Sequence, residues 1–94
     1  MTDIAATLTE RGIRYGSFEG HARITQALKL AMIESPKWLE LADDQMEALQ
    51  MIAHKIGRIL NGDPDYDDSW VDIAEYAKLV ADRLQARNAS AQEG

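Results

Sequence analysis

The sequence predicts an all-α protein, a small bundle of four helices that ends in an antiparallel helical hairpin. Two observations support this prediction. Apolar residues recur every three or four positions along most of the chain, and glycine, proline, serine or aspartate separates the apolar stretches. No segment alternates apolar and polar residues as a half-buried β-strand does. The 94 residues, 46% of them hydrophobic, are sufficient for one domain.

The first predicted helix covers residues 3–13, and the second begins after Ser17. The apolar residues of the first helix are Ile4, Leu8 and Ile13. Gly16 ends the first helix because glycine readily adopts the left-handed conformation found at helix C-termini. Ser17 is suited to cap the second helix, which ends before Pro36 because the residue before a proline resists the α conformation.

The third predicted helix runs from an Asp43 cap to about Leu60, and the fourth begins at an Asp67 cap. Gly62 ends the third helix, and the short connection favours antiparallel packing of the last two helices. Residues 1–87 are therefore expected to form a single helical domain.

Residues 88–94 are small and polar, which predicts a flexible tail. A domain this small often completes its core by association, so we expect a homo-oligomer, a dimer or higher. The 16 acidic residues outnumber the 10 basic ones, so no DNA binding is expected. Without cysteine there can be no disulfide or thiolate nucleophile. No secretory signal and no long apolar run is visible, which predicts a cytoplasmic protein away from the membrane.

Charged residues on the last two helices are predicted to meet across the hairpin. In an antiparallel hairpin centred on Pro64, the numbers of facing residues add up to about 128. This rule places Lys55 and Arg58 level with residues 70–73, within reach of Asp72. Two interpretations stay open: a fold-specifying ion pair, or a polar site in which the cations hold phosphate and Asp72 orients them or binds a metal.

The remaining acidic residues are better explained as helix caps than as metal ligands. Residues 43–47 could align carboxylates for Mg²⁺, but the hairpin separates them from Asp72 by about 15 Å. Residues 63–74 begin like a calcium loop, yet Asp68 replaces the required glycine and Ala74 the bidentate glutamate. Acids at a helix N-terminus also interact favourably with the helix dipole.

The two histidines and two tryptophans have simpler interpretations than a metal or cofactor site. His21 and His54 are too few and too isolated for a zinc site, and His21 is expected to be half-buried. Trp38 and Trp70 are expected to anchor the core or an interface between subunits.

Three motifs together resemble a family of small phage and prophage helical proteins. These motifs are Arg14-Tyr15-Gly16, HKIGRI (residues 54–59) and DSWVDIAEYAKL (residues 68–79). Members of that family carry Tyr-Gly, then K-x-x-R, then D-S-x-V-D-I-A-x-Y-A. The family is in turn distantly similar to the MazG-type all-α pyrophosphohydrolases. Those enzymes are oligomers of helical hairpins that split nucleoside triphosphates with Mg²⁺.

The resemblance implies a nucleotide-binding protein or a relative of the nucleoside triphosphate pyrophosphohydrolases. It assigns phosphate or base binding to Lys55, Arg58, Tyr15 and Tyr76. It assigns Mg²⁺ to Asp68 and Asp72, with Glu19 and His21 as weaker candidates. The enzymes need E-E-x-x-E on one helix and E-x-x-D on the next, and here Ser69 replaces that last glutamate. The resemblance therefore implies a degenerate metal site, and nucleotide binding without cleavage is one expectation.

A second hypothesis is a non-catalytic phage accessory protein that binds a protein of the host, for example to block a defence system. Its function would then lie on an exposed apolar or acidic face, and its compartment would be the host cytoplasm. The two hypotheses differ in where they place the function, because nucleotide binding requires a polar pocket near Asp72.

Overall fold

The computed structural model describes residues 4–93, and every regular element in that range is helical. The elements in chain order are α1 (Ile4–Tyr15), α2 (Phe18–Ile33), the short 3₁₀ helix η1 (Trp38–Glu40), α3 (Asp43–Asn61) and α4 (Asp67–Glu93). The predicted all-α class with four helices is confirmed. The predicted first residue of α1, at position 3, and the last residue of the tail lie outside the described range.

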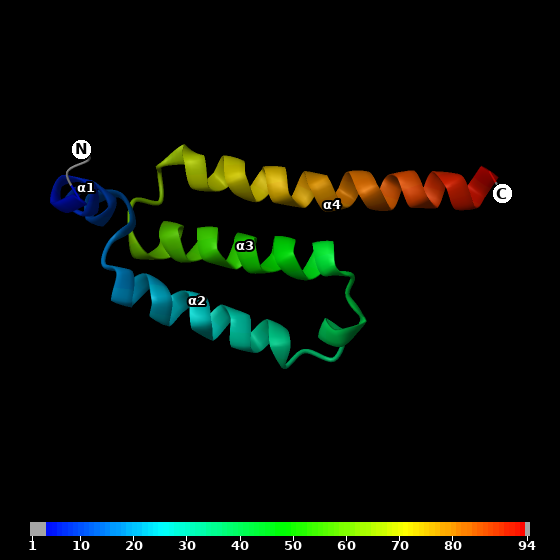
Figure 1. Ribbon diagram of the computed structural model, residues 1–94, viewed down its shortest axis with the longest axis horizontal. Coiled ribbons are helices and arrows are strands. Elements are labelled where there is room, and N and C mark those ends of the chain that lie inside the picture. The colour runs from blue at the N-terminus through cyan, green and yellow to red at the C-terminus, as the bar shows by residue number, and fades with distance from the viewer. Residues whose placement is uncertain (1–3, 94) are drawn as a thin grey trace.

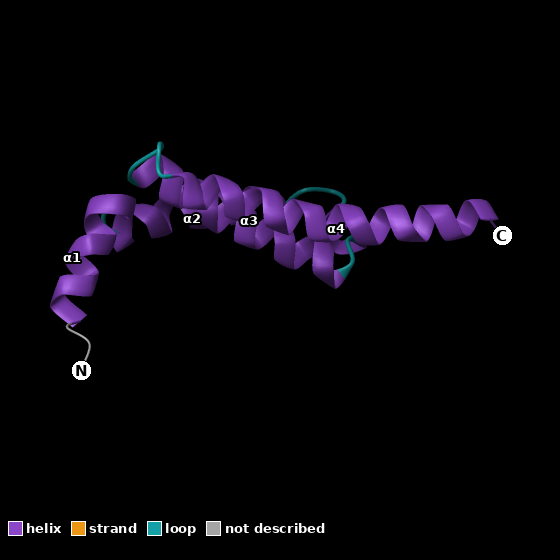
Figure 2. Cartoon of the chain, turned by 90° about the horizontal axis from the view of Figure 1, so that it is seen from above, coloured by secondary structure: helices purple, strands orange, loops and turns teal. Residues whose placement is uncertain are grey.

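Helices α2, α3 and α4 lie side by side in one layer, with α3 in the middle (Figure 1). The view from above shows α1 turned away from this layer at one end (Figure 2). The C-terminal part of α4 extends beyond the start of α3 (Figure 1). The chain is elongated, with principal extents of 56 × 29 × 27 Å. None of the helices within residues 4–93 has the length and apolar composition needed to cross a membrane.

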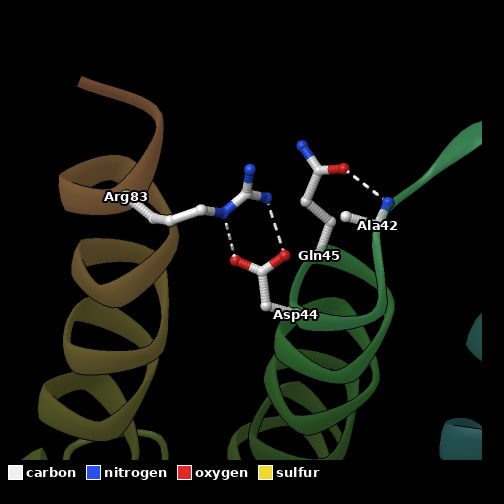
Figure 3. Close-up of polar contacts among 4 residues, drawn as sticks. All are labelled: Ala42, Asp44, Gln45 and Arg83. Atoms are coloured by element: carbon white, nitrogen blue, oxygen red, sulfur yellow. Dashed lines mark hydrogen bonds and ion pairs between the residues drawn. The ribbon is translucent and has the colours of Figure 1, made fainter. Parts of the chain in front are cut away.

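Local signals set the start of α2 and α3. Ser17 is the N-cap of α2, and its side chain accepts a hydrogen bond from the backbone N–H of Gly20 at 3.0 Å, as predicted. The predicted cap of α3 is wrong by one residue. Ala42 is the N-cap, and Asp43 lies in the first turn. The backbone N–H of Ala42 donates to the Gln45 side chain at 2.8 Å (Figure 3). This bond satisfies one of the free backbone N–H groups at the start of the helix, where the alanine side chain offers no acceptor.

The last helix also differs from the sequence prediction at both ends. Asp67 is the first residue of α4 and lies with Asp68 in the first turn, where a carboxylate interacts favourably with the positive end of the helix dipole. The helix then continues through Glu93, so residues 88–93 of the predicted tail are helical. The flexibility of this segment stays a prediction.

Two ion pairs establish the register of the α3–α4 hairpin. Lys55 Nζ lies 3.0 Å from a carboxylate oxygen of Asp72, and the Arg83 guanidinium makes a bidentate contact with Asp44 (Figure 3). In both pairs the residue numbers add up to 127, within one of the predicted value. The antiparallel hairpin and its register are therefore confirmed.

The monomer has a very small apolar core. Among the described residues, the buried hydrophobic ones are Trp38, Ala48, Ala53 and Ile59. Trp38 is thus a core residue, whereas Trp70 stays 55% exposed and its indole N–H donates to the Pro64 carbonyl at 2.8 Å. Most large apolar side chains of the helices remain in contact with solvent.

Candidate functional site

A pocket of about 540 Å³ lies where α1, α2 and α3 meet. The side chains that define its chemistry are Arg11, Tyr15, Phe18, His21, His54 and Arg58. They combine two guanidinium groups, two imidazoles and two aromatic rings. The sequence prediction assigned Tyr15 and Arg58 to nucleotide binding, but it assigned His21 to the metal.

Backbone contacts at the end of α3 hold the wall of this pocket. The side-chain amide of Asn61 donates to the carbonyls of Tyr15 at 2.7 Å and Ser17 at 2.8 Å. Gly16, between them, has a φ of +74°, and a Cβ there would collide with the Asn61 carbonyl. Glycine is therefore required at this turn for both conformation and space. The predicted left-handed stop at Gly16 is confirmed, and the turn fixes Tyr15 against α3.

Arg58 and Tyr15, which both line the pocket, form a cation–π contact. The Arg58 guanidinium lies 4.4 Å from the centre of the Tyr15 ring. The Tyr15 ring is 6.1 Å from that of Tyr66, and Arg14 lies 4.4 Å from the Tyr66 ring. Such contacts orient a guanidinium without neutralising its charge.

The positive charges of the pocket have no carboxylate partner within it. Within residues 4–93, neither Arg11 nor Arg58 forms an ion pair with an aspartate or glutamate. Arg58 is half-buried and Arg11 is exposed. A half-buried guanidinium that retains its donors is suited to bind an anion such as phosphate.

The two histidines are in contact, which the sequence prediction of isolated histidines did not anticipate. His21 Nε2 lies 3.2 Å from His54 Nδ1, and the Thr25 hydroxyl lies 3.4 Å from His21 Nε2. His21 is 7% exposed, so it is buried rather than half-buried. The rings are 33 residues apart in sequence and meet because α2 packs against α3.

The contact between the two rings joins one donor to one acceptor, and the tautomers decide which ring donates. His21 Nδ1 is buried and faces Gly57, where an added Cβ would come within 3.0 Å. A hydrogen bond with the backbone of Gly57 raises the pKa of His21 and partly offsets the effect of burial. His21 therefore contacts α3 at both His54 and Gly57.

Both imidazoles are neutral at neutral pH. Burial is the main cause that lowers the pKa of His54 to about 4, followed by the neighbouring His21 and the charge of Arg58. Burial, and then Arg58, also lowers the pKa of His21. The imidazoles therefore add no charge to the pocket, and the arginines supply it.

The structure divides the predicted phosphate-binding residues between two places. Lys55 pairs with Asp72, and its side chain is only 12% exposed. Arg58, expected beside the same aspartate, contacts Tyr15 instead. Tyr76 lies on α4 and does not line the pocket. The predicted Lys55–Asp72 contact is confirmed, and the binding roles stay predictions.

The structure distributes the predicted Mg²⁺ ligands over α2 and α4. Asp68 accepts a hydrogen bond from the Tyr66 hydroxyl at 2.7 Å, and Asp72 is engaged by Lys55. Glu19 lines a separate shallow groove on α2, away from His54. No group of three or more histidine, aspartate or glutamate side chains in the described part of the chain could hold a metal ion. Binding of Mg²⁺, a hard cation that prefers several oxygen ligands, stays a prediction for these residues.

Of the six side chains that define the pocket chemistry, the sequence prediction did not select Arg11, Phe18 and His54 for binding. One signal could have located the His21–His54 contact. Gly57 lies inside a helix, where glycine is unfavourable, and such a position often marks close approach of another element. Here that element is α2, through Thr25 and His21.

Comparison with known protein families places the chain in one of them. The model of the family described as Domain of unknown function (DUF6378) matches residues 3–84. No curated protein and no solved structure matches the chain. The match covers the four helices, including the pocket and the hairpin with both ion pairs, up to residue 84. The chain therefore belongs to the DUF6378 family.

Proposed function

We propose that this protein binds a nucleotide in the pocket between α1, α2 and α3. The observation that carries the proposal is the half-buried Arg58, which contacts Tyr15 and has no carboxylate partner within residues 4–93. A nucleotide combines the two features that such a site recognises, an anionic phosphate and an aromatic base.

The size and chemistry of the pocket agree with this ligand class. Its volume of about 540 Å³ is in the range of small-molecule sites. Arg58 and Arg11 would bind phosphate oxygens, and the rings of Tyr15 and Phe18 offer apolar surfaces to a base. The resemblance to distant MazG-like proteins supports the same ligand class.

The proposed activity is binding rather than metal-dependent cleavage. The carboxylates that the related pyrophosphohydrolases use are partly replaced, and Asp72 is occupied by Lys55. We therefore expect nucleotide binding to persist when Mg²⁺ is removed with a chelator. Release of pyrophosphate from a panel of nucleoside triphosphates should stay at the level of the reaction without protein.

The test is calorimetric titration of nucleoside mono-, di- and triphosphates into the full chain, with Arg58→Gln and Arg87→Gln compared. Both variants remove one guanidinium, but Arg87 is exposed on α4 and distant in sequence from the pocket residues. Loss of one charge-assisted phosphate contact should weaken binding roughly tenfold or more in Arg58→Gln. Arg87→Gln should bind like the unmodified chain.

Two results would contradict the proposal. One is the failure of every nucleotide to bind or to raise the melting temperature of the unmodified chain. The other is equal weakening by both substitutions, which would indicate a general charge effect.

A second candidate function is binding of another protein through α1. Its apolar side chains Ile4 and Leu8 lie on one side of the helix and are 72% and 62% exposed, so α1 hardly contributes to the core. An exposed apolar helix face is typical of recognition by a partner groove. If this hypothesis holds, a stoichiometric partner from a host lysate should be lost in Ile4→Glu and retained in Asp72→Ala.

A further inference from the structure

We infer that one face of the helical layer is the interface between two copies of this chain. This apolar face is formed by Leu49, Ile52 and Ile56 of α3 with Trp70, Ala77 and Val80 of α4. Four of these residues, Leu49, Ile52, Ala77 and Val80, line a groove of about 280 Å³ between the two helices. The inference does not depend on nucleotide binding.

Helical geometry shows why these side chains share one side of the layer. Successive residues of an α-helix are turned by about 100°, so residues seven apart project in nearly the same direction. Ile56 therefore lies above Leu49 on α3, and Trp70 shares its side of α4 with Ala77. The apolar side chains of α3 and α4 form one continuous face, because residues of both helices line the groove between them.

The other directions around α3 are already occupied. Lys55 points toward α4, where it meets Asp72, and His54 points toward α2, where it meets His21. Arg58 lies on the side that faces α1 and the pocket. Among the described helices, none packs over the remaining side of α3 (Figures 1 and 2), and helical spacing places Leu49, Ile52 and Ile56 on that side.

The area of the monomer indicates how much surface is left to cover. A compact protein of 10.5 kDa has an accessible surface of about 5,400 Å². This chain has 6984 Å², and its radius of gyration is 16.6 Å where a compact domain of this length has about 12 Å. Part of the excess belongs to the end of α4. Half of the excess surface would still equal the roughly 800 Å² that each partner buries in a standard interface.

The chemistry of the face suits a permanent contact. The groove is lined by apolar residues and the uncharged Gln45, so covering it desolvates no ion. No residue that lines the groove is charged, so the side chains that give the chain its net charge of −6 lie outside the groove. Apolar interfaces without charged groups are typical of obligate homo-oligomers.

A second copy is the partner that the small core favours. Four buried hydrophobic residues are few for an independent fold, so folding should be coupled to association. An identical chain is present whenever the first is made, and a two-fold axis lets the same face pair with itself. Domains need two packed layers around a core, and the second layer would come from the partner. The pocket, on the opposite side of α3, would stay open.

The test is sedimentation equilibrium of the full chain at micromolar concentration, with Leu49→Lys compared with Leu79→Lys. Both leucines are on the hairpin and partly or largely exposed, at 40% and 68%, and both substitutions add the same charge. Leu79 is two residues from Ala77 and therefore lies on another side of α4. We expect a mass of twice 10.5 kDa for the unmodified chain and for Leu79→Lys, and dissociation of Leu49→Lys.

If Leu49→Lys fails to fold, two alanine variants test the placement of the interface instead. Leu49→Ala should raise the dissociation constant of the dimer roughly tenfold or more, and Leu79→Ala should leave it unchanged. A folded, monomeric unmodified chain would overturn the inference and assign the face to a different protein. An unchanged dissociation constant in Leu49→Ala would overturn the placement of the interface.

Discussion

The two sides of α3 hold their neighbouring helices by different means. Toward α2, the contact consists of uncharged groups, with the buried His21 and Thr25 and the half-buried His54 around Gly57. Toward α4, it contains the ion pairs of Lys55 with Asp72 and of Asp44 with Arg83. The α2 side is specified mainly by shape, and the α4 side is specified in part by charge.

This difference has consequences for what each side tolerates. A shape-specified contact is sensitive to a single added methyl group, because the buried atoms have no room to move. A partly exposed ion pair tolerates changes of size, but it depends on both partners being charged. Four substitutions or conditions separate the two cases.

The largest effect is expected on the α2 side, from Gly57→Ala. The added Cβ would come within 2.5 Å of the Thr25 hydroxyl oxygen and 3.0 Å of His21 Nδ1. Alanine gains about 1 kcal/mol over glycine within a helix, but overpacking a buried contact costs about 1–3 kcal/mol or more. We expect a net loss of up to about 2 kcal/mol in the free energy of unfolding, measured by urea denaturation.

Gly12→Ala is the matched control, since Gly12 is also inside a helix and no atom lies within 4 Å of an added Cβ there. It should leave stability unchanged or raise it by up to about 1 kcal/mol. If Gly57→Ala were as stable as Gly12→Ala, the α2–α3 contact would not be specified by shape.

On the α4 side, Asp72→Ala should lower stability by about 1–2 kcal/mol. It leaves the Lys55 ammonium, with only 12% of its side chain exposed, without its partner. The cost is below the 3–5 kcal/mol of a fully buried pair because Asp72 is 37% exposed. The double substitution Lys55→Met with Asp72→Leu should recover most of the loss, as urea denaturation of both variants would show. A loss as large as the sum of the single changes would contradict a mutual ion pair.

The hairpin could be predicted from the sequence because its determinants are local. Gly62 and the acids from Asp67 onward mark the loop, and a short loop fixes which residues face each other. Lys55 therefore met Asp72 as expected. Asp43 was placed wrongly as a cap because the glutamine that satisfies the helix end acts from inside the first turn.

The pocket could not be predicted, because it depends on the packing angles of three helices. Periodicity identifies the apolar side of a helix, but it does not determine where α1 turns away from the layer. Tyr15 and Arg58 are 43 positions apart, and they meet through the Asn61 contacts with the α1–α2 turn. The rule that aligned α3 with α4 says nothing about α2, so the contact between His21 and His54 was missed.

Acid should weaken the α2 side before the α4 side. Burial lowers the pKa of His54 from 6.5 to about 4 and lowers that of His21 as well, so the unfolded chain binds more protons between about pH 6.5 and 4. Stability should therefore fall as pH falls through this window, by about 1 kcal/mol from pH 7 to 5 because His54 is partly exposed. Denaturation at several pH values measures this slope, and His54→Asn should flatten it. An unchanged slope in that variant would contradict the assignment to the histidine pair.

The smallest effect is expected from Asp44→Asn, which breaks the exposed contact with Arg83 at the open end of the hairpin (Figure 3). The hydrogen bonds from Arg83 lower the pKa of Asp44, so this contact is complete at neutral pH and is lost only below the ordinary value of 3.8. The change in urea midpoint should be smaller than that of Asp72→Ala, and high salt should reduce it further, because solvent and ions screen an exposed pair. Arg83→Gln should behave in the same way. An effect of Asp44→Asn that equals that of Asp72→Ala and persists in high salt would mean that the bidentate geometry, rather than burial, determines the strength of the α4 side.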